Sequence, residues 1–281
     1  MFAALERLKF TLPFAASPEQ EIFAIGDVHG RADLLAALIE EAARETRLRE
    51  RRTIVFLGDL IDRGPDSLGA IDLAISAATR IGADEGITLM GNHEAMMRRV
   101  LDPSTPRDDA ISGLEAWMAN GGDQTLAEFV AFDEPPEDLD QLLAAARGSL
   151  PERVRAWLGG LRASWRSGAI LFVHAGVNPN FDLEEFLAIP WNLPLANLDE
   201  DRHWAWVRWP FLNYRPGPDG FSGMFVVHGH TPNDGRRVAR HEDQIARFRL
   251  NLDAGSGLTG VAKMAIIRGR QALVIAARGP E

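Results

Sequence analysis

Five short apolar runs along the chain each end next to a polar residue of a metal-binding type. The runs cover residues 21–25, 53–57, 86–90, 169–173 and 224–227. They are short and rich in β-branched and aromatic side chains, which predicts buried strands. In open α/β sheets, ligands bind outside the carboxyl ends of the strands. The residues that follow each run are therefore candidate site residues.

The first three runs share one pattern, in which the run is followed by glycine and then by Asp or Asn. The three motifs are Gly26-Asp27-Val28-His29-Gly30, Gly58-Asp59-Leu60-Ile61-Asp62-Arg63-Gly64 and Gly91-Asn92-His93-Glu94. Their spacing of roughly 30 residues is that of successive βαβ units, so we expect the three loops at one edge of a parallel sheet. Residues 31–47 and 65–81, between the motifs, have apolar positions at helical spacing and predict two helices.

The two later runs end in histidine. One is followed by His174-Ala175-Gly176 and the other by His228-Gly229-His230-Thr231. Beyond them, residues 236–239, 246–252, 261–268 and 271–276 are typical of short strands, which we expect to form hairpins that complete the sheets. Glycines in residues 255–260 match a dinucleotide-binding pattern, but a strand follows instead of a helix, so a tight turn or a bulge bordering the site is expected.

Residues 95 to about 167 contain no convincing strand and predict a helical insertion beside the site. Helical periodicity covers residues 111–119, 124–132, 139–146 and 152–161. The insertion can pack as ordinary core or form a wall of the substrate cleft, and we favour the second interpretation. The segment 178–220 is hard to assign; its three tryptophans, Trp204, Trp206 and Trp209, favour core or interface packing over substrate stacking.

Composition limits the chemistry that these loops can carry. The 281 residues, 46% of them apolar, can fill one domain spanning residues 1–281. Because the chain has no cysteine, any metal must bind through nitrogen and oxygen. A net charge of -10 argues against a nucleic-acid polymer or an anionic membrane as partner. Residues 1–20 make a poor signal peptide and no window could span a bilayer, so we expect a cytoplasmic protein.

The polar residues at the strand ends suit a site for two divalent metals. Such a site needs several nitrogen or oxygen ligands and a carboxylate that bridges the metals. Asp27, His29 and Asp59 could hold one metal. Asp59, Asn92, His174 and His230 could hold the other. This imidazole content favours manganese, iron or zinc over magnesium or calcium, and manganese is our first expectation.

The remaining polar residues suit hydrolysis of a phosphoester. A water that bridges two metals loses a proton easily, and the hydroxide can attack phosphorus directly. His93 would then be free to protonate the departing oxygen, with Asp62 to orient it. Arg63 and Arg208 would bind the phosphate oxygens and neutralise charge in the transition state.

These motifs together resemble the metal-dependent phosphoprotein phosphatase family of the calcineurin-like metallophosphoesterases, in its bacterial serine/threonine phosphatase branch. The resemblance spans Asp27 to His230. It implies an α/β fold of the α+β type, a sandwich of two mixed sheets flanked by helices, and the ligand sets above. It also favours His230 over His228 as the last ligand, and Arg208 as the second phosphate-binding arginine, although the Trp-rich surroundings of Arg208 depart from the family pattern.

Three functions remain open from the sequence. The first is a phosphomonoesterase acting on phosphorylated serine, threonine or tyrosine in proteins, or on a small phosphoester. The second is a hydrolase that splits diadenosine tetraphosphate symmetrically; those enzymes usually carry Gln where this chain has His29, which favours the phosphatase. The third is a non-catalytic metal-binding module, which the complete ligand set together with His93 disfavours.

Overall fold

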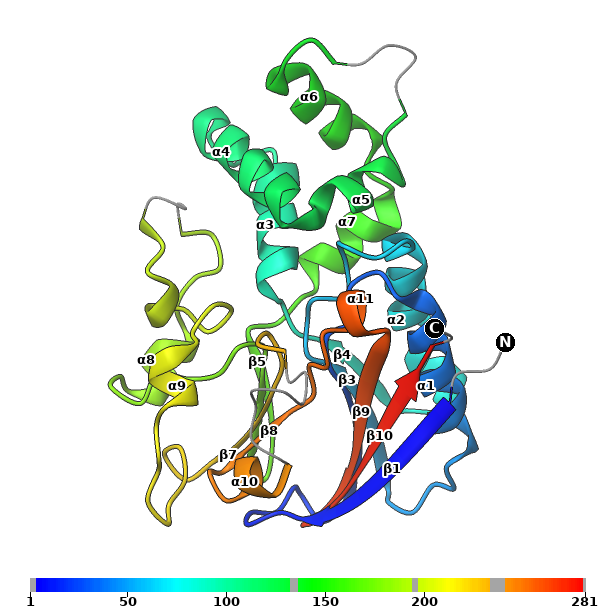
Figure 1. The fold of residues 1–281 in the computed structure, drawn as a ribbon, viewed down its shortest axis with the longest axis vertical. Coiled ribbons are helices and arrows are strands. Elements are labelled where there is room, and N and C mark those ends of the chain that lie inside the picture. Colours follow the sequence, from blue (N-terminus) through cyan, green and yellow to red (C-terminus); the bar gives the residue numbers. More distant parts are fainter. Residues whose placement is uncertain (1–3, 132–135, 194–196, 233–240, 280–281) are drawn as a thin grey trace.

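The computed structural model describes residues 4–131, 136–193, 197–232 and 241–279. These residues form two β-sheets that pack against each other, with helices around them (Figure 1). Both sheets contain parallel and antiparallel pairs. The predicted α/β sandwich of two mixed sheets flanked by helices is therefore confirmed.

The larger sheet has six strands, and its centre is parallel. In spatial order the strands are β1 (Ala4–Thr11), β10 (Gln271–Arg278), β9 (Val261–Arg268), β2 (Gln20–Ile25), β3 (Arg51–Phe56) and β4 (Glu85–Thr88). Strands β2, β3 and β4 run parallel, whereas β9, β10 and β1 are antiparallel to their neighbours. The loops that follow β2, β3 and β4 consequently share one edge, as the βαβ spacing predicts.

The smaller sheet has four strands. They are β5 (Ser164–Ser167), β6 (Ile170–Val173), β7 (Phe225–His228) and β8 (Arg249–Asn251), and β6, β7 and β8 run parallel. Strand β5 corrects the prediction that residues 95–167 contain no strand. Its sequence Ser-Trp-Arg-Ser carries no apolar run because β5 lies at the edge of the sheet, where three of its four residues stay partly exposed.

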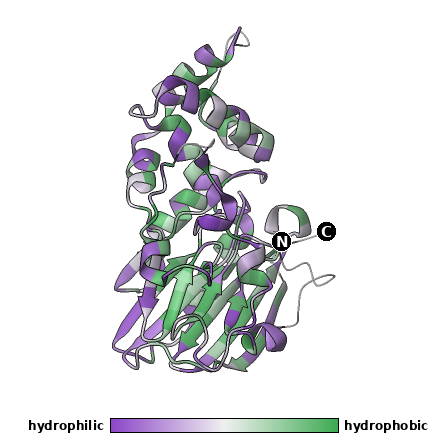
Figure 2. Ribbon diagram, turned by 90° about the vertical axis from the view of Figure 1, so that its left-hand side faces the viewer, coloured by the Kyte–Doolittle hydropathy of each residue, from purple (hydrophilic) through white to green (hydrophobic). Residues whose placement is uncertain are grey.

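Alternate residues of each central strand face opposite sides, which builds the core in two parts. On β2, Ile22 and Ala24 pack in the cluster between the sheets, whereas Phe23 and Ile25 face the other way. On β6 the same alternation sends Phe172 between the sheets. Figure 2 shows hydrophobic residues concentrated in the central strands. The core between the sheets fixes how the two sets of strand ends face each other.

Two helices cover the outer face of the six-stranded sheet. They are α1 (Ala32–Arg44) and α2 (Ser67–Ile81), and their buried residues pack with the outward side chains of β2 and β3. Asp66 caps the start of α2 by accepting a hydrogen bond from Gly69 N at 2.9 Å. Gly82 ends it in the left-handed conformation. Both helices agree with the predicted segments 31–47 and 65–81.

A layer of helices stands over the carboxyl ends of the strands (Figure 1). It consists of α3 (Asn92–Leu101), α4 (Arg107–Trp117), the π-helix η1 (Met118–Gly122), α5 (Asp123–Ala127), α6 (Leu139–Ser149) and α7 (Glu152–Gly159). We call residues 107–127 the α4–α5 segment. The predicted helix 124–132 is too long, because α5 ends at Ala127. Residue 132 lies outside the described residues.

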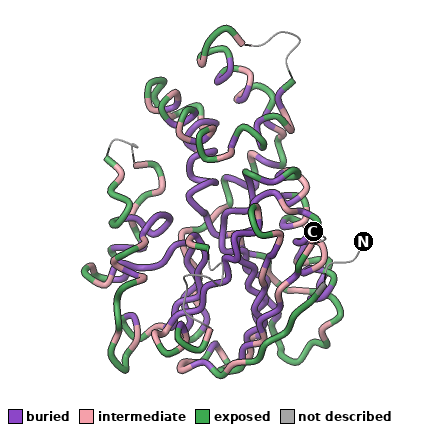
Figure 3. The backbone as a smooth tube through the Cα atoms, in the orientation of Figure 1, coloured by how far each residue is buried: buried purple, intermediate pink, exposed green. Residues whose placement is uncertain are grey.

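The described residues of the segment 178–220 pack on the outward face of the four-stranded sheet. It contains α8 (Leu183–Leu187), the 3₁₀-helix η3 (Glu200–Arg202) and α9 (Trp209–Leu212). Trp204 and Trp206 are buried, as the core interpretation predicts, and Figure 3 shows the buried chain running through this part of the molecule. Trp209 is 62% exposed, so it is not part of the core of this chain, and interface packing stays a prediction for this tryptophan.

The structure departs from the sequence-based expectation at one edge strand of each sheet, β1 and β8. Strand β1 is absent from the prediction, and it pairs along its whole length with β10. Its Leu5 and Leu8 are exposed, so β1 lacks the apolar face of a buried strand. The predicted strand 246–252 is also shorter, because only Arg249–Asn251 pairs with β7 after the short helix α10 (His241–Ile245).

Residues 255–260 form the one-turn helix α11 (Ser256–Thr259) instead of a simple turn. Gly255 and Gly260 flank α11 in the left-handed conformation, which explains the glycine pattern without a nucleotide. The predicted strand 236–239 lies outside the described residues. Among the helices of the described chain, none combines the length and the apolar character needed to cross a membrane.

Candidate metal centre

The loops after β2, β3 and β4 deliver most of the predicted site residues. Asp27 and His29 follow β2, Asp59 and Asp62 follow β3, and Asn92 opens α3 directly beyond the end of β4. Backbone bonds join the first two loops, because Val28 N and His29 N both donate to Asp59 O, at 3.0 and 2.9 Å. These residues are buried, with exposed fractions of 8% or less.

The four-stranded sheet supplies the two histidines. His174 follows β6 and His230 follows β7, and Gly229 N donates to His174 O at 2.7 Å. His230 N donates to Asp27 Oδ2 at 3.0 Å, which joins the histidine loop to the β2 loop across the sandwich. Gly229 allows this approach, because a Cβ there would overlap Asp27 Oδ1. The two sheets therefore bring their polar strand ends into one site.

Asp59 Oδ2 lies at the centre of this site. It is 3.3 Å from His174 Nε2, 3.7 Å from His29 Nε2 and 4.0 Å from His93 Nε2. On the other side, Asn92 Oδ1 is 3.2 Å from His174 Nε2 and 2.8 Å from His230 Nδ1. Asp59 thus belongs to two groups of possible ligand atoms, His29–Asp59–His93 and Asp59–His174–His230, each within 4.8 Å.

The second nitrogen of each histidine faces a backbone carbonyl. His29 Nδ1 donates to Ile61 O at 3.0 Å, and His174 Nδ1 donates to Leu57 O at 2.9 Å. His230 uses its other nitrogen, Nε2, to donate to Trp206 O at 3.1 Å. These bonds fix the tautomers that leave His29 Nε2, His174 Nε2 and His230 Nδ1 free of protons and turned inward, as metal ligands require.

Asp27 supplies an independent test of whether a metal fits. Its Oδ1 is buried and has no hydrogen-bond partner among the described residues. Burial raises the pKa of Asp27 well above its ordinary value, and the charges of Asp253 and Asp59 raise it further. A divalent cation would give Oδ1 a partner and stabilise the ionised carboxylate. The donor set of imidazoles, carboxylates and an amide oxygen also fits the predicted metals.

The backbone of the site is held in an unusual conformation. Among the described non-glycine residues, seven have φ in the left-handed region, and five of them are in this site: His29 (φ 48), Asp59 (φ 52), Asp62 (φ 72), Arg63 (φ 68) and His230 (φ 68). Such angles cost free energy and persist where surrounding contacts enforce them. The concentration of strain at these loops is typical of a functional site.

His93 lies against Asp62 and Arg63. Its Nδ1 is 2.6 Å from Asp62 Oδ2, and its Nε2 is 2.9 Å from Arg63 Nη2. Burial alone would lower the pKa of His93, but the charge of Asp59 and the hydrogen bond with Asp62 outweigh it and raise that pKa. His93 also belongs to one group of possible ligands, so the distances alone allow it to be a ligand or a proton donor.

Arg63 and Arg208 lie on two sides of the site. Arg63 Nη1 is 3.0 Å from His29 Nε2, so its guanidinium spans two of the histidines. Arg208, just before α9, donates from Nη1 to Thr231 Oγ1 at 3.0 Å, next to His230. Both arginines therefore reach the site, Arg63 directly and Arg208 at its edge.

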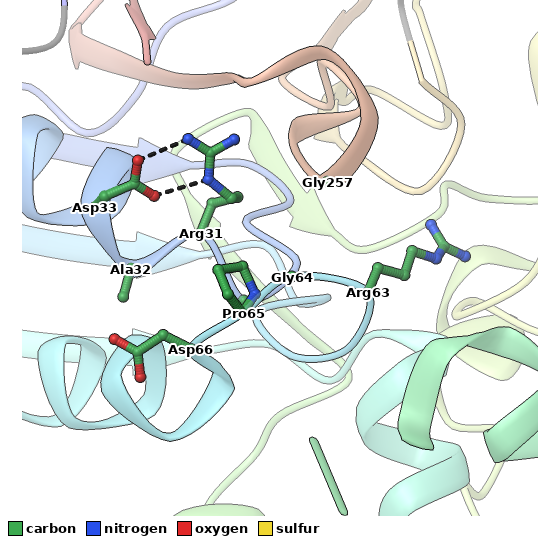
Figure 4. A pocket seen from close by; sticks show the side chains of 9 residues that line it. Arg31, Ala32, Asp33, Arg63, Gly64, Pro65, Asp66 and Gly257 are labelled. Carbon is green, nitrogen blue, oxygen red and sulfur yellow. Dashed lines mark hydrogen bonds and ion pairs between the residues drawn. The ribbon is translucent and has the colours of Figure 1, made fainter. Parts of the chain in front are cut away.

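A depression of about 490 Å³ adjoins the site on the side of α1 and α2. Figure 4 shows Arg31 paired with Asp33 in this depression, while the Arg63 side chain turns away from them. Gly257 of α11 forms another part of its lining. A Cβ at Gly257 would lie 3.4 Å from the Cβ atoms of both His29 and Arg63, so residues 255–260 border the site as expected.

Sequence reasoning missed two buried carboxylates. Glu94 accepts hydrogen bonds from Asp59 N and Leu60 N, both at 2.8 Å, and thereby holds the β3 loop. Asp253 follows β8, and burial raises its pKa to about 6. Glu94 could have been found as the third residue after Gly91, where a capping side chain belongs. Asp253 repeats the pattern of a polar residue just beyond a strand.

Comparisons with known proteins agree with this geometry. A family model described as calcineurin-like phosphoesterase matches residues 21–256. The chain is 33% identical over 104 residues to serine/threonine-protein phosphatase 1 of Salmonella typhimurium, a match covering 37% of this chain and 40% of that protein. It is 26% identical to the zinc-dependent endopolyphosphatase of Saccharomyces cerevisiae, over 79% of this chain and 70% of that one.

A third relative is the symmetrical bis(5'-nucleosyl)-tetraphosphatase of Acidovorax sp., which is 26% identical over 59% of this chain and 48% of its own. The chain thus spans less than half the length of the first and third of these relatives. The family model, by contrast, covers the loops after β2, β3, β4, β6 and β7. This chain belongs to the calcineurin-like phosphoesterases, which are hydrolases that use divalent metals.

Proposed function

We propose that this chain is a two-metal phosphomonoesterase that removes phosphate from serine, threonine or tyrosine side chains of proteins. The observation that carries the proposal is the convergence of ligand-type atoms on Asp59 Oδ2, with His93, Asp62 and Arg63 beside them. Asp27, His29 and Asp59 would hold one metal; Asp59, Asn92, His174 and His230 would hold the other. Manganese is the metal that we would load first.

When bound, the two metals would supply Lewis-acid chemistry, with polarised phosphate oxygens and a water acidic enough to serve as nucleophile at neutral pH. The protein residues have three tasks around that chemistry. Asp59 places its Oδ2 between the two ligand groups. Arg63 binds phosphate oxygens through its guanidinium and balances the negative charge that grows in the transition state. Arg208 would do the same from the opposite edge.

His93 would supply the proton for the departing oxygen. Asp62 accepts from Nδ1, which leaves Nε2 to carry the transferable proton toward the substrate. In the structure the same Nε2 accepts from Arg63 Nη2 at 2.9 Å. When Arg63 binds phosphate instead, Nε2 would be free to carry the proton, and the ester oxygen would lie within its reach. The resulting alcohol leaves neutral, and no covalent intermediate with the protein is needed.

Symmetrical hydrolysis of diadenosine tetraphosphate is the second candidate. The similarity to the Acidovorax tetraphosphatase favours it. The similarity to the Salmonella phosphatase and the presence of His29 favour the phosphomonoesterase. Both candidates use the same metal chemistry, so the choice depends on the residues around the site.

The two candidates are separated by comparing kcat/KM of the manganese-loaded chain for a panel of phosphopeptides and for diadenosine tetraphosphate. The proposal predicts a higher value for at least one phosphopeptide. A higher value for the dinucleotide, with two molecules of ADP as product, would transfer the function to the second candidate. A metal-loaded chain that hydrolyses neither would indicate a non-catalytic module.

A further inference from the structure

The Asp62 carboxylate is fully buried and receives hydrogen bonds from two distant parts of the chain. His93 Nδ1 donates to Oδ2 at 2.6 Å. Trp117 Nε1 lies 2.9 Å from Oδ2 and 3.1 Å from Oδ1, and Thr125 Oγ1 donates to Oδ1 at 2.6 Å. Trp117 and Thr125 both belong to the α4–α5 segment. This segment is thus bonded to the residue that orients His93.

We propose that Trp117 and Thr125 are positioning residues, which hold Asp62 in the orientation that keeps His93 aimed at the departing oxygen of the substrate. The inference rests on the proposed function, in which His93 protonates that oxygen. It assigns to the α4–α5 segment a task in the reaction itself, beyond packing or lining the cleft.

The need for positioning follows from the geometry of Asp62. A carboxylate bound only to His93 could rotate about its Cβ–Cγ bond and still keep one hydrogen bond. The indole and hydroxyl donors engage both oxygens and so fix the plane of the carboxylate. Thr125 also accepts from Asp62 N at 3.0 Å, so it holds the backbone and the side chain of the same residue. That backbone is strained, with φ 72, and needs such support.

The break in the helix between Trp117 and Thr125 makes the double contact possible. Eight residues separate them, so on a regular α-helix the two side chains would stand about 80° apart. The π-helix η1 and Gly121, with φ 99, interrupt the regular winding. At this break Gly121 O accepts from Arg63 N at 3.0 Å, and a Cβ on Gly121 would lie 2.7 Å from Arg63 Cγ. The same turn therefore supports Asp62 and Arg63 together.

The test uses variants that remove one donor and little volume, Trp117→Phe and Thr125→Val. Trp157→Phe is the matched control, because Trp157 is also a buried tryptophan of the helical layer but its Nε1 has no partner among the described residues. Each manganese-loaded variant is assayed on a phosphoserine peptide, whose leaving group is strongly basic, and on p-nitrophenyl phosphate, whose leaving group is weakly basic. Metal content and Tm are measured for every variant.

A defect in proton donation harms the basic leaving group most. We expect both variants to lose about tenfold in kcat on the phosphoserine peptide and less than about twofold on p-nitrophenyl phosphate. KM and metal content should stay near wild type. Thr125→Ser, which keeps the hydroxyl, should recover kcat on the peptide, and Trp157→Phe should behave as wild type on both substrates.

Equal losses on both substrates, or losses that follow metal content or Tm, would overturn the positioning role and leave a structural one. Wild-type rates in both variants would also overturn it. His93→Asn separates this failure from failure of the proposed function. One outcome is that His93→Asn loses more activity on the phosphoserine peptide than on p-nitrophenyl phosphate while Trp117→Phe and Thr125→Val do not. In that case only the positioning role of Trp117 and Thr125 is refuted. A wild-type chain inactive on both phosphomonoesters would overturn the proposed function and the inference with it.

Discussion

Two clusters of buried charge lie at opposite ends of the six-stranded sheet, and they differ in how the charge is balanced. At the amino end of β2, Glu21 accepts from Arg52 Nε at 2.7 Å and from Arg268 Nε at 2.9 Å. At the carboxyl end, Asp27 and Asp253 are buried, and their neighbours include Asp59. Glu21 is paired with two arginines, whereas Asp27 Oδ1 has no hydrogen-bond partner among the described residues.

The pKa shifts express the same difference. Burial raises the pKa of Glu21, but the hydrogen bonds from Arg52 and Arg268 outweigh it and lower the value. Burial raises the pKa of Asp27 and the neighbouring carboxylates raise it further. The balanced cluster stabilises the folded chain without any ligand. The unbalanced cluster around Asp27 would be stabilised most by a divalent cation. We therefore assign a metal-binding function to this cluster and a purely structural role to the cluster around Glu21.

The largest expected effect comes from Asp59→Asn. This change removes the charge of the carboxylate that belongs to both ligand groups, so binding of both metals should weaken and phosphatase activity should fall below about 10⁻³ of wild type. Metal analysis of the dialysed variant measures the first effect, and phosphate release measures the second. Retention of two metals at wild-type affinity would contradict the bridging role of Asp59.

His93→Asn should reduce kcat by about 10²- to 10⁴-fold on a phosphoserine peptide, because the proton donor is lost. Metal content should remain near two per chain, since His93 is not among the proposed ligands. Phosphate release and metal analysis on the same preparation provide both values. Loss of a metal together with His93 would make it a ligand and would refute its assignment as the acid.

Arg52→Met tests the balanced cluster. The change leaves Glu21 buried with Arg268 as its ion-pair partner and Leu48 N as a second donor, and it removes the bonds from Arg52 to Ile81 O and Glu45 O. We expect the free energy of unfolding to fall by about 3–5 kcal/mol, as it does when one partner of a buried ion pair is removed. Urea unfolding gives this value. The kcat of the folded variant should be unchanged, and a stability loss below about 1 kcal/mol would show that the cluster is dispensable.

The smallest effect concerns His203, whose ring packs against those of Trp204 and Trp206. Burial lowers the pKa of His203 to about 4, so the folded chain resists its protonation. The neutral ring therefore contributes fully to the free energy of unfolding above the unfolded-state pKa of about 6.5. This stability is lost as pH falls toward 4, by up to about 1.4 kcal/mol per pH unit. Urea unfolding at pH 7.5 and 5.0, without metal, should show a smaller pH dependence for His203→Gln. An equal dependence in both proteins would refute this account.

The sequence predicts those parts of the molecule that are encoded locally. An apolar run followed by glycine and a ligand-type residue is readable over about ten positions, so the loops containing Asp27, Asp59 and Asn92 could be predicted. The spacing of these loops also predicts that β2, β3 and β4 run parallel and end at one edge of the sheet, as they do. Strand β1 could not be predicted in this way, because its Leu5 and Leu8 are exposed and only its pairing with β10 defines it.

The supporting residues of the site depend on contacts between distant positions. Thr125 reaches Asp62 across 63 positions of the sequence, and the π-helix that aims it has no pattern that we could recognise. Asp253 directly follows the predicted strand 246–252, but Leu252 stands where the other loops have glycine, so Asp253 lacks the pattern that marked them. Motifs therefore reveal the atoms that meet the substrate, while the atoms that hold them in place require the fold.

The measurement that tests the central claim most directly is a titration of the metal-free chain with Mn²⁺, in which bound metal per chain and phosphate release from a phosphopeptide are followed together. Two sites that share Asp59 predict that activity develops only as the second equivalent binds and then stays constant. Full activity at one bound metal, or no binding of a second metal at the active site, would contradict the account.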